Sequence, residues 1–104
     1  MITKMIQAII RPEKEEGVIA ALENEGIFPF TRQFVLGRGR QKGITVGNVR
    51  YEELSKVWLM LIVSDTECDR AVSAIEIAAC TGNPGDGKIF VSTLTESRTI
   101  HHAV

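Results

Sequence analysis

The sequence lacks a strong charge of either sign and any long hydrophobic run. Its 12 basic and 13 acidic side chains give a net charge of −1, which argues against general nucleic-acid binding, where a strongly basic domain is expected. No apolar run approaches the roughly 20 residues of a membrane span, and the first residues do not combine a basic segment with a long apolar one. We therefore expect a cytoplasmic protein with no segment inserted in a membrane.

Cysteine is also scarce. The two cysteines, Cys68 and Cys80, fall on one predicted helix, whose rise of 1.5 Å per residue would hold their Cα atoms roughly 18 Å apart. A disulfide between them is geometrically implausible. The sequence predicts two buried or partly buried free thiols instead, which suits a reducing compartment.

The remaining composition, with 44% hydrophobic and 24% charged residues, is that of an ordinary globular protein. A chain of 104 residues is long enough for one core and too short for two. Residues 1–104 are therefore expected to form a single domain.

Hydrophobic periodicity predicts alternating strands and helices. In chain order we expect a strand over 1–10, a helix from Pro12 to about Glu25, strands over 30–36 and 57–63, a helix from Ser64 or Asp65 to about Cys80, and a strand over 88–94. The β-α-β-β-α-β order indicates an α+β, ferredoxin-like fold, with an antiparallel four-stranded sheet and two helices on one face. Residues 44–54 could form a hairpin through Gly47-Asn48, but no clear apolar face emerges and a mobile loop is the favoured interpretation.

The run Val57–Val63 is the most hydrophobic in the chain, and its apolar residues point to both faces of the predicted strand. Because the helices cover only one face of the sheet, we expect the other face to be buried in an oligomer. The alternative is a solvent-exposed face with scattered hydrophobic residues.

Two glycine-punctuated segments are candidates for binding chemistry. The first, which we call the glycine loop, is Thr81–Lys88; it contains three glycines and a proline and places Lys88 at the start of the last strand. Little side-chain bulk lets backbone N–H groups approach an anion, and the lysine adds positive charge. Phosphate is the natural ligand, although an ordinary turn with an exposed lysine has the same composition.

The second segment is Gly37–Gly43, which carries three cations and one amide, namely Arg38, Arg40, Lys42 and Gln41. Together with Lys88, these residues suggest two walls of a polyanion site, in which the glutamine amide could ligate a metal. The alternative is a basic loop that remains solvated or contacts nucleic acid.

With both segments placed on this fold, the chain resembles the PII family of nitrogen signal-transduction proteins. The matching motifs are Ala8–Pro12, Gly39–Gly43, Thr81-Gly82 and Gly85–Val91, and the match runs through nearly the whole length. The resemblance implies a homotrimer, or a mixed assembly of related subunits, with nucleotide sites in the clefts between subunits. PII proteins bind ATP or ADP competitively and, with Mg-ATP present, 2-oxoglutarate, which reshapes a protruding T-loop (about 38–55 here) that engages a target protein.

The resemblance also assigns roles to individual residues. In the nucleotide site, Gly85, Gly87 and Lys88 would hold the phosphates and Asp86 would shape the loop. Facing residues in that site would be Thr31 at the adenine, Gly37, Gly39, Arg40, and Arg98 as a substitute for an arginine of the family's tail. In the 2-oxoglutarate site, Gln41 would ligate Mg²⁺, Lys42 would lie nearby, and Lys56 would pair with the far carboxylate.

Some features depart from the familiar enteric members. The segment between Gly43 and Lys56 is several residues shorter, and Tyr51 does not fit the pattern around their uridylylated tyrosine, so uridylylation is not expected. The short loop and the run Leu59–Leu61 look similar to PII-like regulators associated with nitrogenase. The expected target is therefore nitrogenase or an ammonium transporter.

Two other classes are weighed against this interpretation. A small ferredoxin-like nucleic-acid-binding module is the alternative, but such modules use aromatic residues on central strands and net positive charge, whereas Trp58 stands alone on its strand. No nucleophile–base pair or metal-ligand cluster can be identified from the spacing, so we do not expect an enzyme.

Overall fold

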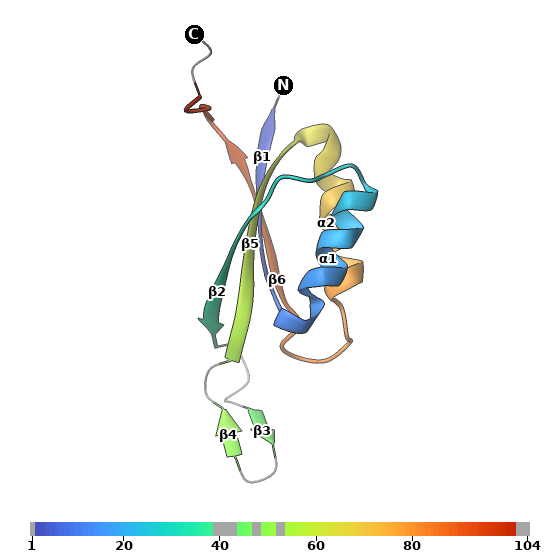
Figure 1. The fold of residues 1–104 in the computed structure, drawn as a ribbon, viewed down its shortest axis with the longest axis vertical. Helices are drawn as coiled ribbons and strands as arrows, with labels where there is room; N and C mark the ends of the chain where they lie inside the picture. The colour runs from blue at the N-terminus through green and yellow to red at the C-terminus, as the bar shows by residue number, and fades with distance from the viewer. Residues whose placement is uncertain (1, 39–43, 47–48, 52–53, 102–104) are drawn as a thin grey trace.

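The computed structural model describes residues 2–38, 44–46, 49–51 and 54–101. In chain order, the described elements are β1 (Thr3–Ile10), the 3₁₀ turn η1 (Pro12–Lys14), α1 (Glu15–Asn24), β2 (Thr31–Gly37), β3 (Ile44–Val46), β4 (Val49–Tyr51), β5 (Leu54–Ser64), α2 (Asp65–Ala79) and β6 (Gly87–Leu94). An antiparallel sheet has the order β2-β5-β1-β6, and α1 and α2 pack on one side of it (Figure 1). The predicted ferredoxin-like α+β fold is confirmed.

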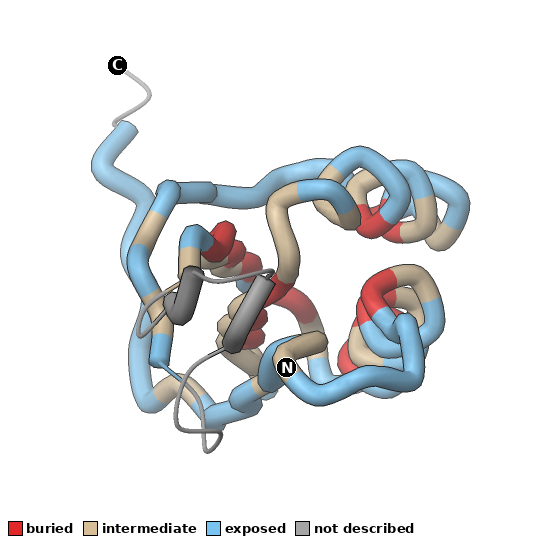
Figure 2. The backbone as a smooth tube through the Cα atoms, turned by 90° about the horizontal axis from the view of Figure 1, so that it is seen from below, coloured by how far each residue is buried: buried red, intermediate tan, exposed pale blue. Residues whose placement is uncertain are grey.

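The core lies between the sheet and the two helices. Side chains alternate between the two faces of a strand, so Ile6 and Ile10 of β1 point to the helices, and their partners Leu61 and Val57 on β5 do the same. Figure 2 shows the buried residues on the facing sides of the two layers. The helices contribute six buried residues to this core, namely Val18, Leu22, Cys68, Ala71, Ile75 and Ala79.

The helix ends follow local sequence signals. Ser64 begins α2 in a capping box, in which the Ser64 backbone N–H and hydroxyl both donate to the Glu67 carboxylate. These bonds from Ser64 hold the pKa of Glu67 below its usual value. At the end of α1, Gly26 has φ +78°, and the N–H groups of Gly26 and Ile27 bond to the carbonyls of Glu23 and Leu22. This is a Schellman motif, in which glycine avoids the strain that a side chain would cause.

The segment that follows β2 was predicted to be a mobile loop, and this was wrong for residues 44–46 and 49–51. They form an antiparallel pair, β3 and β4, in which Ile44 is opposite Tyr51 and Val46 opposite Val49. The hairpin projects beyond the end of the main sheet (Figure 1). The β-branched residues favour extended backbone, whereas the prediction required an apolar face for packing, which a projecting hairpin does not need.

The thiol prediction holds in part. Both cysteines are free; Cys68 is buried but Cys80 is exposed. The helix ends one residue earlier than predicted, and Cys80 adopts an extended conformation with φ −73° and ψ 130° as the chain leaves α2. None of the helices in the described part of the chain is long and apolar enough to cross a membrane.

The sheet face opposite the helices has no covering layer in the described chain. This open face carries Trp58 and Met60 of β5, next to Ile9 and Gln7 of β1 in the pairing register. Ile62 and Phe90 are 41% and 50% exposed. Such an apolar surface is what the sequence predicts to be covered in an oligomer.

Gly17 and Gly26 provide a matched pair of stability tests. A Cβ added to Gly17 in α1 meets nothing within 4 Å, so Gly17→Ala should raise the free energy of unfolding by about 0.5–1 kcal/mol through reduced chain entropy. Gly26→Ala should lower it by about 1–2 kcal/mol, because alanine is strained at positive φ. Urea unfolding followed by circular dichroism measures both, and equal effects of the two substitutions would contradict this account.

Candidate functional site

The glycine loop connects α2 to β6 and depends on its glycines. Gly82, Gly85 and Gly87 have φ values of +85°, +96° and +118°, which side chains rarely tolerate. At Gly87 an added Cβ would lie only 1.7 Å from the carbonyl oxygen of Ile9. The end of β1 therefore approaches the loop so closely that only glycine fits where β6 begins.

Asp86 organises the inside of this loop. Its carboxylate accepts hydrogen bonds from the N–H groups of Thr81 at 2.7 Å and Gly82 at 3.0 Å, and from the Thr81 hydroxyl. It also accepts a bond from Arg11 Nε at 3.0 Å. The Thr81 hydroxyl and N–H, together with these other donors, hold the pKa of Asp86 well below its usual range. One ionised carboxylate thus joins the two ends of the loop.

Two cations hold consecutive carbonyl groups in the middle of the loop. Arg11 Nη2 donates to the carbonyl of Pro84 at 2.9 Å, and Lys56 Nζ donates to the carbonyl of Gly85. Arg11 follows β1 and Lys56 lies on β5. The conformation of the loop is therefore set from the two central strands of the sheet.

Lys56 is charged and yet buried, with 7% of its surface exposed. Burial lowers the pKa of Lys56, as does the nearby positive charge of Arg11, while Glu13 and Asp86 act in the opposite direction. Gly37 packs against its stem, since a Cβ at Gly37 would lie 3.1 Å from Lys56 Cγ. A buried lysine that is hydrogen-bonded to a carbonyl, without a close carboxylate partner among the bonds described, is suited to receive an anion.

A pocket of about 400 Å³ lies beside these residues and is called here the basic pocket. Three cations, Arg38, Lys56 and Lys88, line it. Gly37, Gly85 and Gly87 contribute backbone with little bulk, and Ile9, Leu54, Pro84 and Phe90 contribute apolar surface. Its lining combines apolar contacts with a few convergent charges, as small-ligand sites do.

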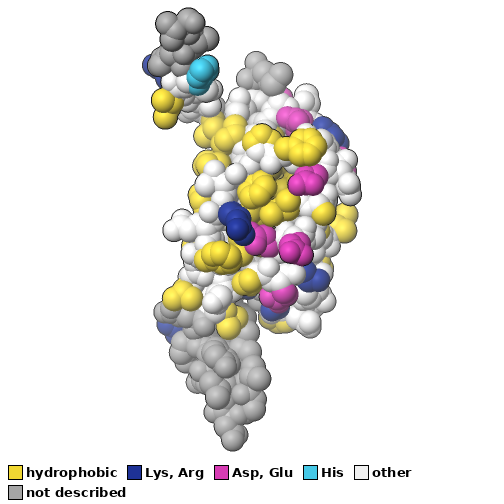
Figure 3. Space-filling view, viewed as in Figure 1, with side chains coloured by type: hydrophobic (Ala, Val, Ile, Leu, Met, Phe, Trp, Pro, Cys, Tyr) yellow, Lys and Arg dark blue, Asp and Glu magenta, His cyan; other side chains and the backbone are white. Residues whose placement is uncertain are grey.

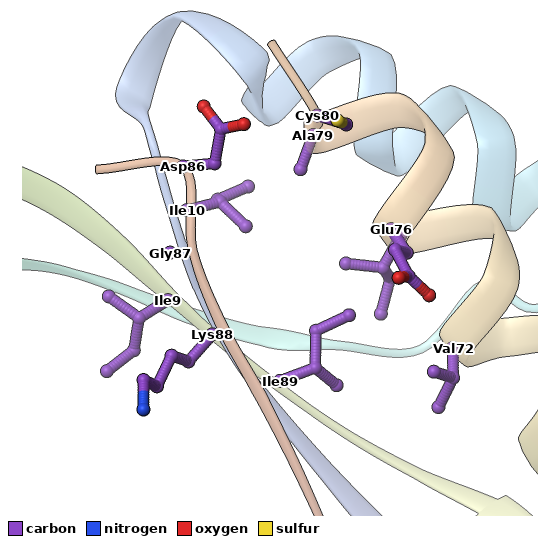
Figure 4. Close-up of a pocket in the computed structure, with 11 residues that line it drawn as sticks. Ile9, Ile10, Val72, Glu76, Ala79, Cys80, Asp86, Gly87, Lys88 and Ile89 are labelled. Carbon is purple, nitrogen blue, oxygen red and sulfur yellow. The ribbon is translucent and has the colours of Figure 1, made fainter. Parts of the chain in front are cut away.

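A second pocket of similar volume, the helix-side cleft, lies between β6 and the end of α2. Figure 4 shows Ile89 directed towards α2 in this cleft, whereas the Lys88 side chain lies on the Ile9 side of the strand. The cleft is lined mainly by apolar residues, and its acidic residues are Glu76 and Asp86. These carboxylates disfavour an anion, so the basic pocket is the better candidate for one.

The surface of the helical layer carries many acidic side chains. Among the described residues, acidic side chains occur along both helices, with Glu15 and Glu16 in the first turn of α1 and Asp65 and Glu67 in that of α2. Figure 3 shows acidic side chains over the helical layer, with basic side chains among them. At the basic pocket, in contrast, the charged lining residues are the cations Arg38, Lys56 and Lys88, which favour entry of an anion at that end of the sheet.

The structure brings together part of the predicted site. Gly37, Lys56, Gly85, Gly87 and Lys88 all line the basic pocket, and Asp86 shapes the adjoining loop. Gly39, Arg40, Gln41 and Lys42 lie outside the described residues, so their predicted roles stay predictions.

Two predicted residues lie far from this pocket within the chain. Thr31 begins β2, roughly 20 Å along the strand from Gly37. Arg98 follows the opposite end of β6 from Lys88; it is exposed and forms an ion pair with Glu96. One chain therefore does not bring Thr31 or Arg98 to Lys88.

The sequence argument missed a role for Arg11. The residue was part of a recognised motif, but nothing in its neighbourhood indicated a partner 75 positions away. Its place between a buried strand and Pro12 was the available signal, because a charged residue there can be directed at whatever packs against the end of the strand. Among the described residues, no cluster of histidine, cysteine or acidic residues could hold a metal ion.

Comparison with known proteins identifies the family. The family model described as nitrogen regulatory protein P-II matches residues 3–103. The chain belongs to the P-II family. Three relatives agree with this P-II assignment. The "Nitrogen fixation nifHD region GlnB-like protein 1" of Methanothermococcus thermolithotrophicus is 47% identical and that of Methanobacterium ivanovii 48%, each over 93% of this chain and 92% of the relative. "Nitrogen regulatory protein P-II 2" of Methanothermobacter thermautotrophicus is 45% identical over 89% of this chain and 84% of the relative.

This P-II membership confirms the resemblance inferred from the two loop motifs. It favours the P-II interpretation over the alternative that the sequence left open, a nucleic-acid-binding module.

The hydrogen bonds of Asp86 make a prediction for the acid stability of this P-II chain. Because its pKa is lowered by folding, its stabilising contribution is present above the ordinary value of 3.8 and is lost as the pH falls towards the lowered value. Asp86→Asn should therefore flatten the decline in unfolding free energy below about pH 4. Urea unfolding at pH 2–6 measures this, with Asp69→Asn on the exposed surface of α2 as control. An acid profile identical to that of the wild type would contradict the role of Asp86.

Proposed function

We propose that this P-II chain is a non-catalytic regulator of nitrogen metabolism that binds ATP or ADP and, together with Mg-ATP, 2-oxoglutarate. The observation that supports it best is the basic pocket, where Lys56 and Lys88 meet the backbone of the glycine loop. A lysine, a glycine-rich backbone and an apolar lining are the groups that a nucleotide requires. No nucleophile is assigned, because binding alone is sufficient for a regulator.

In the nucleotide site, the phosphates lie against Gly85, Gly87 and Lys88, and Gly37 faces them across the pocket. Arg40 and Gly39 extend this wall. In this proposal the nucleotide occupies a cleft between subunits. The distance of Thr31 and Arg98 from Lys88 within one chain supports a role for both residues in the site of a neighbouring subunit.

The 2-oxoglutarate site adjoins the phosphates. Lys56 pairs with the far carboxylate, and Gln41 ligates Mg²⁺ beside the near carboxylate and keto group, with Lys42 close by. An amide oxygen suits a hard cation such as Mg²⁺. Since the metal and the nucleotide complete this site, the effector binds only when both are present, and the two ligands are thermodynamically coupled.

The assembly and the target complete the proposal. The open sheet face, with Trp58, Met60, Ile62 and Phe90, supports burial in a trimer or in a mixed assembly of related P-II subunits. The T-loop over about 38–55, which includes the hairpin β3–β4, engages the target protein. The names of two relatives refer to nifHD regions, which favours nitrogenase over an ammonium transporter as that target.

Isothermal titration calorimetry tests the coupled site directly. We expect 2-oxoglutarate to bind only in the presence of Mg-ATP. Lys88→Ala should weaken ATP roughly tenfold or more by removing a charged phosphate contact, whereas Gln41→Ala should abolish 2-oxoglutarate binding and retain some ATP binding. Lys4→Ala is the control, because Lys4 bonds to Thr93 and does not line the basic pocket. Unchanged ATP affinity in Lys88→Ala would remove this lysine from the site, and retained effector binding in Gln41→Ala would remove the glutamine.

The pH dependence of 2-oxoglutarate affinity tests Lys56. A carboxylate favours the protonated lysine, whose pKa in the unligated protein is lowered by burial. Binding therefore takes up a proton above that lowered pKa, and affinity should fall as pH rises through it, by at most about tenfold per pH unit. The same shift makes the unligated protein more stable as pH rises between the lowered value and 10.5.

Titrations from pH 7 to 10 with saturating Mg-ATP measure this effect, with ATP affinity alone as the reference. In Lys56→Gln the remaining affinity should be weak and independent of pH in this range. An equally steep pH dependence in Lys56→Gln would show that another group carries it.

A further inference from the structure

We propose that Arg11 is the positioning residue of the glycine loop: it holds Asp86 and Pro84 from outside the basic pocket, and so sets the affinity of that pocket without lining it. Arg11 lines neither the basic pocket nor the helix-side cleft. The effect on ligand affinity rests on the proposed nucleotide-binding function, whereas the effect on the loop itself does not.

The contacts of Arg11 span the loop. Its Nε lies 3.0 Å from the Asp86 carboxylate and its Nη2 donates to the Pro84 carbonyl at 2.9 Å. The side chains of Arg11 and Asp86 are 21% and 24% exposed, so water screens this ion pair only partly. A planar guanidinium can hold a carboxylate and a carbonyl at once in a fixed geometry, which an ammonium group cannot do equally well.

The backbone of Arg11 is itself fixed. It follows the central strand β1, which is paired with β5 on one side and β6 on the other. Its φ of −66° and ψ of 139° are extended, as expected for a residue before proline. Arg11 therefore transmits the position of the most constrained strand of the sheet to the loop.

Asp86 carries this constraint to the start of the loop. Its second oxygen accepts the N–H groups of Thr81 and Gly82, while the first accepts Arg11 and the Thr81 hydroxyl. Without Arg11, the Asp86 carboxylate would lose its charged donor and the Pro84 carbonyl would lose its bond. Both the beginning and the middle of the loop would then be less restrained, and the backbone at Gly85 and Gly87 would be less well placed to receive a phosphate.

Amide hydrogen exchange of the unligated protein tests the loop. In Arg11→Gln, exchange at the Thr81 and Gly82 amides should be roughly tenfold faster, because their acceptor is no longer held by a charged donor. Arg70→Gln is the matched control, since Arg70 also bonds one carboxylate and one backbone carbonyl, both of Glu25, away from the loop. Arg11→Lys should restore part of the protection by keeping the charge beside Asp86.

Two further comparisons separate positioning from general destabilisation. In an Asp86→Asn background, Arg11→Gln should change exchange at Thr81 and Gly82 much less than it does in the wild type. Its effect on these two amides acts mainly through that carboxylate, whereas its bond to the Pro84 carbonyl is independent of Asp86. Mg-ATP affinity should fall roughly tenfold in Arg11→Gln, with Arg70→Gln within about twofold of the wild type. If Arg11→Gln does not fold, Arg11→Lys supplies the same comparisons with smaller expected changes.

The outcomes are distinguishable. Unchanged exchange at Thr81 and Gly82 in Arg11→Gln overturns the inference. Faster exchange with unchanged Mg-ATP affinity overturns its second half, the dependence of the ligand on Arg11. A wild-type protein that binds no nucleotide contradicts the proposed function, while the exchange measurements still decide whether Arg11 positions the loop.

Discussion

The bonds around the Asp86 carboxylate are the constraint on which the candidate site depends. The chain must pass from the end of α2 to the start of β6 against the end of β1, where Gly87 lies too close to Ile9 for any side chain. Three glycines provide the necessary backbone freedom but also make an unrestrained loop entropically costly to order. Asp86 supplies the restraint by joining Thr81 and Gly82 to Arg11, which fixes the loop to the sheet.

The two central strands of the sheet contribute both to the core and to the candidate site. One face of the sheet packs against the helices, and the hydrophobic core between the two layers holds β1 and β5 in place by close packing. These two strands are also the ones that present Arg11 and Lys56 to the loop. Burying Lys56 is unfavourable unless its charge is compensated. The Gly85 carbonyl and the carboxylates of Glu13 and Asp86 compensate it only in part, because the pKa of Lys56 is still lowered. This incomplete compensation supports the proposal that Lys56 receives an anionic ligand.

The fold was predictable because its signals are local. The apolar runs of β1 and β5, the capping box at Ser64 and the glycine after α1 each require only neighbouring residues. The hairpin β3–β4 was considered but not favoured, because its sequence shows no apolar face that could pack against the core. The glycine loop was recognised from composition, but its conformation was not predictable, since the donors to Asp86 include a residue 75 positions away.

The sequence by itself determined the element order, the inward faces of the helices and the two loop motifs that indicated the P-II family. It did so because hydrophobic periodicity, helix capping and backbone freedom are properties of short stretches of chain. Only the tertiary structure decided that Arg11, Lys56 and the glycine loop meet at one end of the sheet, and that Thr31 and Arg98 do not join them within one chain. Those distances follow from the strand order and the pairing register of the sheet, which bring residues remote in sequence together and keep others apart.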